Sequence, residues 1–115
     1  MRIWFNEDLE SKSLEEQKRI IKEHPHKIKS LRNQDPELVK LAVETNPHVL
    51  SLVRNQTEEL CILAVKQKYY VISHVRNLTD AVIRAAIETD DHAVYYLPEE
   101  LFLKYTEEYK EWKNN

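Results

Sequence analysis

Three arginines recur at a constant spacing of 22 residues, and their guanidinium groups could bind anions. Arg32, Arg54 and Arg76 are each followed by asparagine. Planar guanidinium groups bind carboxylates and phosphates through paired hydrogen bonds, so a row of them would recognise an acidic partner. Alternatively, each arginine ends a helix and pairs with an acidic residue of the adjoining unit: Glu37, Glu59 or Asp80. The sequence leaves both roles open.

A second row with the same spacing holds three histidines and one tyrosine: His26, His48, Tyr70 and His92. Histidine is a common metal ligand, but the ligands of one ion must converge on it. Equivalent atoms of stacked helical units lie roughly 10 Å apart, which is too far for one ion. We therefore expect neither a metal nor another cofactor. Instead, the row should present polar aromatic rings along one edge.

Other reactive side chains have structural explanations. Cys61 could be a nucleophile, but its equivalents 22 residues away are Val39 and Ile83, so a buried and inert thiol is expected. Acidic pairs such as Glu58 and Glu59 fall in predicted first helical turns, where the helix dipole favours negative charge. Glycine is absent, although phosphate-binding loops and nucleophile elbows depend on it. These observations predict a protein that is not an enzyme.

We therefore predict a protein-interaction module that acts as an adaptor or as an inhibitor of a larger protein complex. The expected partner-binding residues come from the two rows, from polar aromatic residues near them and from two basic residues: Lys27, Lys29, His48, Arg54, Tyr70, His74, Arg76, His92 and Tyr95. The alternative is an anion or nucleic-acid binder that uses the basic first unit and the arginine row. The isoelectric point near 6.0 argues against nucleic acid as the main partner, because phosphate neutralisation dominates such binding.

The 22-residue spacing divides the chain into units that each begin with a helix-capping residue. Ser, Thr and Asp side chains accept hydrogen bonds from the free amides of a first helical turn. They occupy the third position of every unit: Ser13, Asp35, Thr57 and Thr79. Apolar residues follow at helical spacing, and the small Ala42 and Ala64 should allow a neighbouring helix to approach closely. Each unit should therefore start with an α-helix.

A second start signal lies later in each unit and predicts a shorter helix. At Asn46 and Pro47, asparagine can cap the helix and proline can occupy its first turn. This helix, of about seven residues, should end at Arg54, with Asn55 in the left-handed conformation usually given to glycine. Helices this short are marginal alone, so the units must stack on one another.

The predicted fold is all-α, a small α-solenoid of 22-residue helical-hairpin repeats that form one domain over residues 1–115. Residues 1–10, with Trp4 and Phe5, should form an N-terminal cap, and residues 99–115 should form one C-terminal capping helix. The four repeats between them are 11–32, 33–54, 55–76 and 77–98.

Charge is distributed unevenly along the chain. The formal net charge is -3, but residues 12–32 carry +4 and residues 88–115 carry -5. Ends of opposite charge can orient a charged partner or draw copies of the chain together. Self-association is therefore a second expectation for partners. The single cysteine, the lack of a signal-peptide pattern and the lack of a long apolar run predict a cytoplasmic protein with no membrane partner.

Part of the pattern resembles the short tandem repeats of a domain-of-unknown-function family seen in giant-virus, algal and bacterial proteins. The resemblance rests on the Asn-Pro-x-x-Leu-x-x-Val pattern from Asn46 to Val53, on Asn-Gln-Thr-Glu-Glu-Leu-Cys from Asn55 to Cys61, and on Ala64-Val65. It covers residues 35–97. It implies an α-helical repeat fold and no reaction, because that family has no assigned activity. It would also fit a viral accessory protein directed at a host complex in the host cytoplasm.

Overall fold

The protein is all-helical over the part that the computed structural model describes, residues 9–114 without the side chains at 109 and 112–114. No strand occurs in this range, so the predicted all-α class is confirmed. From Leu14 onward, α-helices and 3-10 helices (η) alternate until a longer α-helix follows. Their bounds are α2 Leu14–Glu23, η1 Pro25–Ser30, α3 Pro36–Thr45, η2 Pro47–Leu52, α4 Glu58–Gln67, η3 Tyr69–His74, α5 Asp80–Thr89, η4 Asp91–Tyr96 and α6 Glu99–Asn114.

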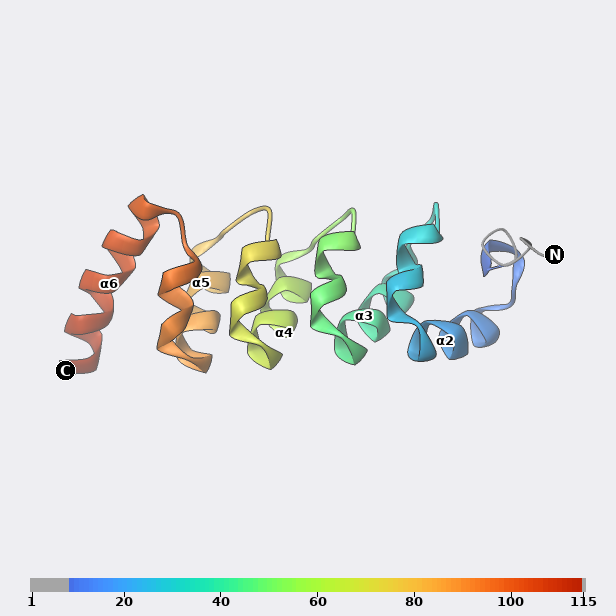
Figure 1. Cartoon of the computed structure of the whole chain (residues 1–115), viewed down its shortest axis with the longest axis horizontal. Helices are drawn as coiled ribbons and strands as arrows, with labels where there is room; N and C mark the ends of the chain where they lie inside the picture. The colour runs from blue at the N-terminus through green and yellow to red at the C-terminus, as the bar shows by residue number, and fades with distance from the viewer. Residues whose placement is uncertain (1–8, 115) are drawn as a thin grey trace.

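The helices form a long row in two layers. Each α-helix from α2 to α4 packs against the next α-helix, and each 3-10 helix packs against the next 3-10 helix, while α6 packs against η4. Figure 1 shows α2 near one end of the row and α6 at the other, with α3 to α5 standing behind the 3-10 helices. The molecule measures 59 × 22 × 19 Å, and its radius of gyration of 16.8 Å exceeds the ~13 Å of a compact chain of this length. Distant parts of the chain therefore do not touch, and each unit depends on its neighbours.

The predicted caps start the four α-helices. Ser13 accepts from the Glu16 amide at 3.3 Å. Asp35 does the same for the amide of Glu37 at 2.8 Å. In the next two units, the hydroxyls of Thr57 and Thr79 accept from the amide three residues ahead, at 3.2 and 3.3 Å. Because a cap acts within one turn, its sequence pattern located these helix starts correctly.

The second helix of each unit differs from the prediction of about seven α-helical residues. It is a 3-10 helix of six residues in every unit. Asn46 caps η2 through the amide of His48, and Pro47 follows in the first turn as predicted. The helix ends at an extended residue, Val53, with φ -86 and ψ 123. The predicted left-handed Asn55 is wrong, because no residue in the described range has a positive φ.

Glutamine side chains explain why no left-handed residue is needed. The Gln56 carboxamide donates through Nε2 to the carbonyls of Leu50 at 2.9 Å and His74 at 3.0 Å, near the ends of η2 and η3. Its Oε1 accepts from the backbone amide of Arg76 at 3.0 Å. Gln34 makes the same contacts one unit earlier. These side chains bind the free backbone groups at a helix end, which a left-handed turn would otherwise satisfy.

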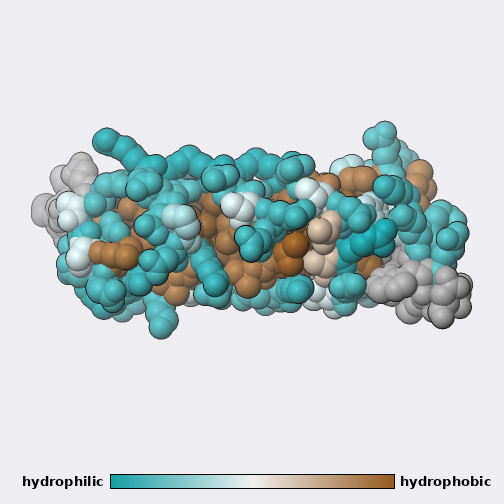
Figure 2. All heavy atoms as spheres, turned by 180° about the vertical axis from the view of Figure 1, so that it is seen from behind, coloured by the Kyte–Doolittle hydropathy of each residue, from teal (hydrophilic) through white to brown (hydrophobic). Residues whose placement is uncertain are grey.

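The core runs between the two layers along the whole row. Ala42, Ala64 and Ala86 are fully buried, as expected where helices approach closely. In the second to fourth units, apolar residues of each 3-10 helix and the residue that follows it are also buried: Val49, Leu50, Val53, Val71, Ile72, Val75, Ala93, Val94 and Leu97. Leu41 and Leu63, by contrast, are only partly buried on the α-helical side. Figure 2 shows apolar side chains at the surface of that side, over α3 and α4.

The two ends of the row close differently. Residues 1–8 of the predicted N-terminal cap lie outside the described range, but Leu9 is buried and Glu10 accepts from the Arg32 amide at 2.9 Å. At the other end, the buried Tyr105 of α6 donates its hydroxyl to Asp80 of α5. Arg84 reaches Asp80 at 2.9 Å and Glu108 of α6 at 3.3 Å. The predicted C-terminal helix therefore packs on the last unit through a polar network.

No helix in residues 9–114 combines the length and the apolar character needed to cross a bilayer.

Candidate functional site

Two members of the arginine row, Arg54 and Arg76, join successive units instead of pairing with acidic residues. The Nη2 atom of Arg76 donates to the carbonyls of Val53 and of Arg54, the second at 3.2 Å. Arg54 donates in the same way to the carbonyls of Leu31 and Arg32, the second at 2.7 Å. These carbonyls directly follow the 3-10 helix of the preceding unit. The guanidinium groups thus bind backbone carbonyls left free at helix ends, so substitution at these positions tests folding before it tests binding.

The expected acidic partners of the arginines have other contacts. Glu37 forms an ion pair with Lys18, with 3.2 Å between Nζ and Oε2. Asp80 binds Arg84 and Tyr105. The hydrogen bond from Tyr105, followed by that from Arg84, lowers the pKa of the Asp80 carboxyl. The proposed pairing of each row arginine with an acid of the adjoining unit is therefore wrong for Arg54 and Arg76, whose guanidinium groups lie on carbonyl oxygens.

Five aromatic side chains of η2, η3 and η4 form a continuous surface cluster, which we call the aromatic edge. The members of the aromatic edge are His48, Tyr69, Tyr70, His74 and Tyr96. The ring centroids of His48 and Tyr70 are 5.4 Å apart, so the expected separation of roughly 10 Å between equivalent residues is wrong for this pair. Side chains on neighbouring helices lean toward one another, which brings their rings closer than the helix axes.

The repeat position of each ring explains the cluster. His48 and Tyr70 are the second residues of their 3-10 helices, whereas His74 and Tyr96 are the sixth. The second residue of one helix meets the sixth residue of the next, at 6.1 Å for His48 and His74 and at 6.4 Å for Tyr70 and Tyr96. Sequence reasoning predicted His48, Tyr70 and His74 but missed Tyr69 and Tyr96. The adjacent tyrosine pairs of the third and fourth units were the available signal.

The aromatic edge is open to solvent and rests on the core. The Tyr96 side chain is 46% exposed, while Tyr69 and Tyr70 are half-buried against core residues. Burial raises the pKa of the Tyr69 hydroxyl. Rings packed on one side are held in place, so they can offer contact area with little loss of side-chain freedom on binding. This is the arrangement expected of a preformed protein-binding surface.

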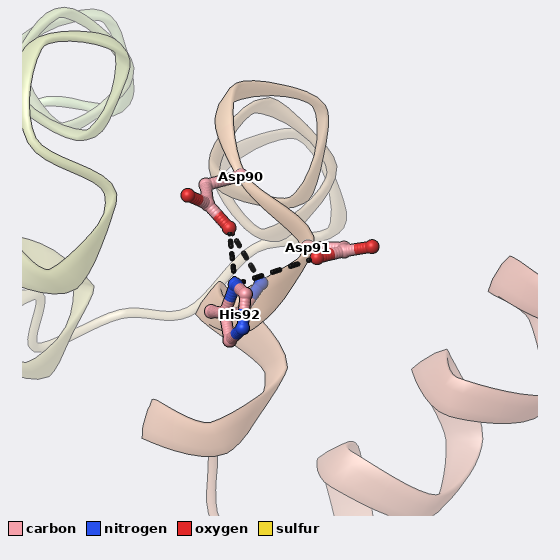
Figure 3. Close-up of side chains that lie close together, drawn as sticks. All are labelled: Asp90, Asp91 and His92. Carbon is pink, nitrogen blue, oxygen red and sulfur yellow. Dashed lines mark hydrogen bonds and ion pairs between the residues drawn. The ribbon is translucent and has the colours of Figure 1, made fainter.

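His92 and Tyr95 form a separate group at the end of the row. Their rings lie 6.1 Å apart, and Tyr95, 70% exposed, also contacts Phe102 of α6 at 5.8 Å. His92 Nδ1 lies 2.7 Å from Asp90 Oδ1 and 3.6 Å from Asp91 Oδ1 (Figure 3). The hydrogen bond with Asp90 raises the pKa of His92. The two predicted residues therefore lie together, beside α6.

The three polar residues at the start of η4 also carry metal-ligand atoms. The ligand atoms of Asp90, Asp91 and His92 all lie within 4.8 Å of one another. However, Asp90 caps η4 by accepting from the His92 amide at 2.9 Å, and this bond, followed by that from the His92 ring, lowers the Asp90 pKa. Capping accounts for the cluster, and such exposed groups do not by themselves indicate a metal site.

The two basic residues expected at the site lie one helix further toward the N-terminus. Lys27 and Lys29 belong to η1, which packs against η2. Lys29 is exposed and Lys27 is partly exposed. They therefore extend the 3-10 side of the molecule beyond the aromatic edge and give that end a positive charge.

Cys61 is buried in α4, as predicted, and its thiol contacts the Gln56 carboxamide at 3.8 Å. Burial raises the pKa of this thiol, which disfavours the reactive thiolate. The interpretation of Cys61 as a core residue is therefore supported by its surroundings.

Sequence reasoning also missed a hollow on the opposite side, between α3 and α4. It has a volume of about 490 Å³, and the residues that line it are Pro36, Lys40, Thr57, Glu59, Leu60 and Leu63. Its apolar floor belongs to the surface seen over α3 and α4 in Figure 2. The incomplete burial of Leu63 could not be recognised from a helical pattern alone.

The predicted residues therefore fall into separate groups. His48, Tyr70 and His74 are brought together in the aromatic edge, His92 and Tyr95 lie beside α6, and Arg54 and Arg76 join units. The function must be inferred from this geometry, because no protein-family model, no curated protein and no solved structure matches the chain.

Proposed function

We propose that this chain is a non-catalytic protein-interaction module, a small α-solenoid of 22-residue helical-hairpin repeats that binds another protein through its aromatic edge. The observation that carries the proposal is the preformed row of rings across η2, η3 and η4. Tyrosine is enriched in protein interfaces because its ring gives apolar contact area and its hydroxyl can still bind a polar group. A small module of this kind acts as an adaptor or as an inhibitor that covers a surface of a larger complex.

The recurrence of the contacts supports the repeat architecture. The α-helices α2 to α5 begin at 14, 36, 58 and 80, a constant step of 22 residues. Gln34 and Gln56 make equivalent hydrogen bonds, and so do Arg54 and Arg76. Stability in such an array comes from contacts between neighbouring units, and the long open faces serve as binding surfaces. The resemblance to a repeat family of unknown function agrees with this proposal.

The alternative function, binding of anions or nucleic acid, is less well supported because several of the cations it would use already have partners. Arg54 and Arg76 bind backbone carbonyls, and Lys18 and Arg19 pair with Glu37 and Glu16, at 3.2 and 3.9 Å. Binding to nucleic acid depends on lysine and arginine side chains that neutralise phosphates and thereby release the counterions condensed on the nucleic acid. The contacts of these side chains therefore favour the protein partner.

Site-specific crosslinking tests the proposed function. A photoreactive phenylalanine analogue is placed at Tyr96 of the aromatic edge or, as the matched control, at Glu59 on the opposite side. We expect adducts with one protein from position 96 only, and their loss when Tyr70 is replaced by serine in a protein with an unchanged melting temperature. Adducts that form from position 59 alone, or that persist in the Tyr70→Ser variant, would contradict a partner at the aromatic edge.

A further inference from the structure

The aromatic edge offers hydrogen-bond donors that the fold leaves unused. Among the residues that the structure describes, the hydroxyls of Tyr69, Tyr70 and Tyr96 take part in no hydrogen bond. In that same part of the chain, the ring nitrogens of His48 and His74 form none either. A tyrosine hydroxyl and a neutral imidazole can each donate one hydrogen bond. A partner seated on these rings should therefore carry free acceptors as well as apolar surface.

Short side chains stand next to two of the rings. Residues three apart share one face of a 3-10 helix, so Ser51 lies beside His48 and Ser73 beside Tyr70. Each serine hydroxyl donates to the backbone carbonyl of that neighbour, at 3.4 Å for Ser51 and at 3.2 Å for Ser73. The serines are thus held close to their own helices, and they leave the two rings accessible from that side.

The same face carries a basic residue over η1. Lys29 lies three residues after His26, the first-unit equivalent of His48, and the side chains of Lys29 and His26 are both exposed. In η4 the same two positions hold His92 and Tyr95, whose rings lie 6.1 Å apart, so these positions are neighbours on one face. Within the described residues Lys29 forms no ion pair. An acidic group of a partner could therefore pair with Lys29.

We propose that the partner segment at the aromatic edge is a proline-rich chain in the polyproline II conformation, with a proline at every third residue and acidic residues at the end over η1. The inference rests on the proposed function and names the chemistry of the partner at the same edge. The rings of Tyr70 and Tyr96 bind the prolines, and Lys29 pairs with the acidic end.

The period of a polyproline II chain matches the spacing of the helical units. Such a chain has three residues per turn and rises about 3.1 Å per residue, so every third residue returns to the same side after about 9 Å. Packed helices lie about 8 to 10 Å apart, so successive prolines would meet successive 3-10 helices. Proline has a carbonyl acceptor and no amide donor, which suits a surface of donating rings. Aromatic surfaces of other proteins bind proline-rich segments in this conformation.

Two other conformations of a partner segment suit the aromatic edge less well. An added β-strand needs the edge of a sheet, and the described residues contain no strand. An α-helix pairs its backbone carbonyls internally, so it would leave them unavailable to the tyrosine hydroxyls. Only the polyproline II chain presents both apolar rings and free carbonyls to the edge.

Fluorescence anisotropy with labelled synthetic peptides tests the inference. The probe has prolines at every third position with alanines between them, and it is made with two glutamates at its N-terminal or at its C-terminal end. The better of the two probes should bind about tenfold more tightly than a peptide of the same composition with prolines at every second position. A helix-forming peptide of leucine and glutamate that binds as tightly as the better probe would overturn the inference. Failure of both probes to bind at about 1 mM would also overturn it.

Substitutions in the aromatic edge locate the bound probe. Tyr70→Ser and the more exposed Tyr96→Ser should each weaken binding about tenfold, because each removes a ring and a donor from the surface. Leu63→Ser, on the opposite side, is the control and should leave the affinity unchanged. Circular dichroism shows which variants keep the helical fold. Folded Tyr70→Ser and Tyr96→Ser proteins that bind the probe as tightly as Leu63→Ser does would contradict the proposed site.

Charge reversal tests the orientation of the acidic end. Lys29→Glu should weaken binding of the better probe about three- to fivefold at low salt, and it should not affect a probe in which glutamine replaces glutamate. Lys40→Glu is the matched control, because Lys40 is also exposed but lies in α3 beside the hollow on the opposite side. Equal effects of the two reversals would show that Lys29 does not pair with the acidic end.

Mapping of the crosslinked partner separates the inference from the proposed function. Mass spectrometry identifies the partner segment that is joined to a photoreactive residue at position 96. This segment should contain prolines three residues apart, with acidic residues at one end. A crosslinked segment without prolines would overturn the inference, while the protein partner at the aromatic edge, and with it the proposed function, would still be supported.

Discussion

Gln56 accepts a hydrogen bond from the backbone amide of Arg76 at 3.0 Å, while the guanidinium group of Arg76 returns to the backbone carbonyls of the preceding unit. Gln34 and Arg54 form the same pair at 2.9 Å. The equivalent pair in the last unit is Leu78 and Pro98, 20 residues apart as in the other units. Leucine has no acceptor and proline has no amide donor, so both halves of the contact are lost together where the row ends.

Replacement of Gln56 by alanine should lower the free energy of unfolding by about 2 to 4 kcal/mol, because three backbone groups lose their hydrogen bonds. Urea denaturation measures the change. Gln67→Ala is the control, since Gln67 makes one bond, to the Val43 carbonyl at 3.3 Å, and should cost about 1 kcal/mol or less. Equal losses for the two variants would contradict the bridging role of Gln56.

Arg76→Met should lower the free energy of unfolding by about 1 to 3 kcal/mol, since it removes a charged donor from the carbonyls of Val53 and Arg54. The aliphatic part of the side chain is largely kept. Arg19→Met serves as the control, because the exposed pair of Arg19 with Glu16 at 3.9 Å should contribute about 0.5 kcal/mol or less. A stable Arg76→Met protein that loses its partner would instead assign Arg76 to binding.

A glutamine introduced at position 78 of the last unit should be tolerated only if position 98 also gains a backbone amide donor. Leu78→Gln should lower stability, because Pro98 offers no amide to the added carboxamide. With Pro98→Arg present as well, part of the loss should be recovered, which gives a coupling of about 0.5 to 3 kcal/mol between the two positions. A double-mutant cycle in urea measures this coupling. Additive effects would show that the pair does not reproduce the Gln56 contact.

The contact of α6 with α5 should respond to alkaline pH. Burial, followed by the hydrogen bond to Asp80, raises the pKa of Tyr105 to about 12. Because an exposed tyrosine has a pKa near 10, the folded state holds this proton more tightly than the unfolded state does. The resulting stability is fully present below about pH 10 and is lost as the pH rises toward 12. The Tyr105→Phe variant should lose less stability than the wild type over this window in urea titrations.

The hydrogen bond between His92 and Asp90 should be visible in the histidine titration. This bond raises the pKa of His92, so its contribution to stability is present below the ordinary histidine pKa and is lost as the pH rises through the higher folded value. Asp90→Ala should lower the His92 pKa in a proton NMR titration and should also remove the cap of η4. An unchanged His92 titration would contradict the contact.

Features that depend on nearby residues could be predicted from the amino-acid sequence alone. Thr57 caps α4 because its hydroxyl and the Leu60 amide lie within one turn, and Ala64 is buried because a 22-residue pattern places it on the inner side of every copy. The burial of Cys61 followed from its own repeat equivalents in the same way. Such features follow from composition and period, and they need no knowledge of how the units meet.

The contacts between units depend on how successive units pack, and they could not be predicted from the sequence. Gln56 and Arg76 are 20 residues apart, and the rings of Tyr70 and Tyr96 are 26 apart, so the distance between them depends on the packing of successive helices. The same packing brings the guanidinium groups of Arg54 and Arg76 to backbone carbonyls and leaves Leu63 only partly buried. The unpaired backbone carbonyls at a helix end can be hydrogen-bonded by a turn through a left-handed residue or by a side chain from another unit. The local sequence does not distinguish these two solutions. In this protein the second solution occurs, because the packing of neighbouring units brings carboxamide and guanidinium groups within hydrogen-bonding distance of these backbone groups.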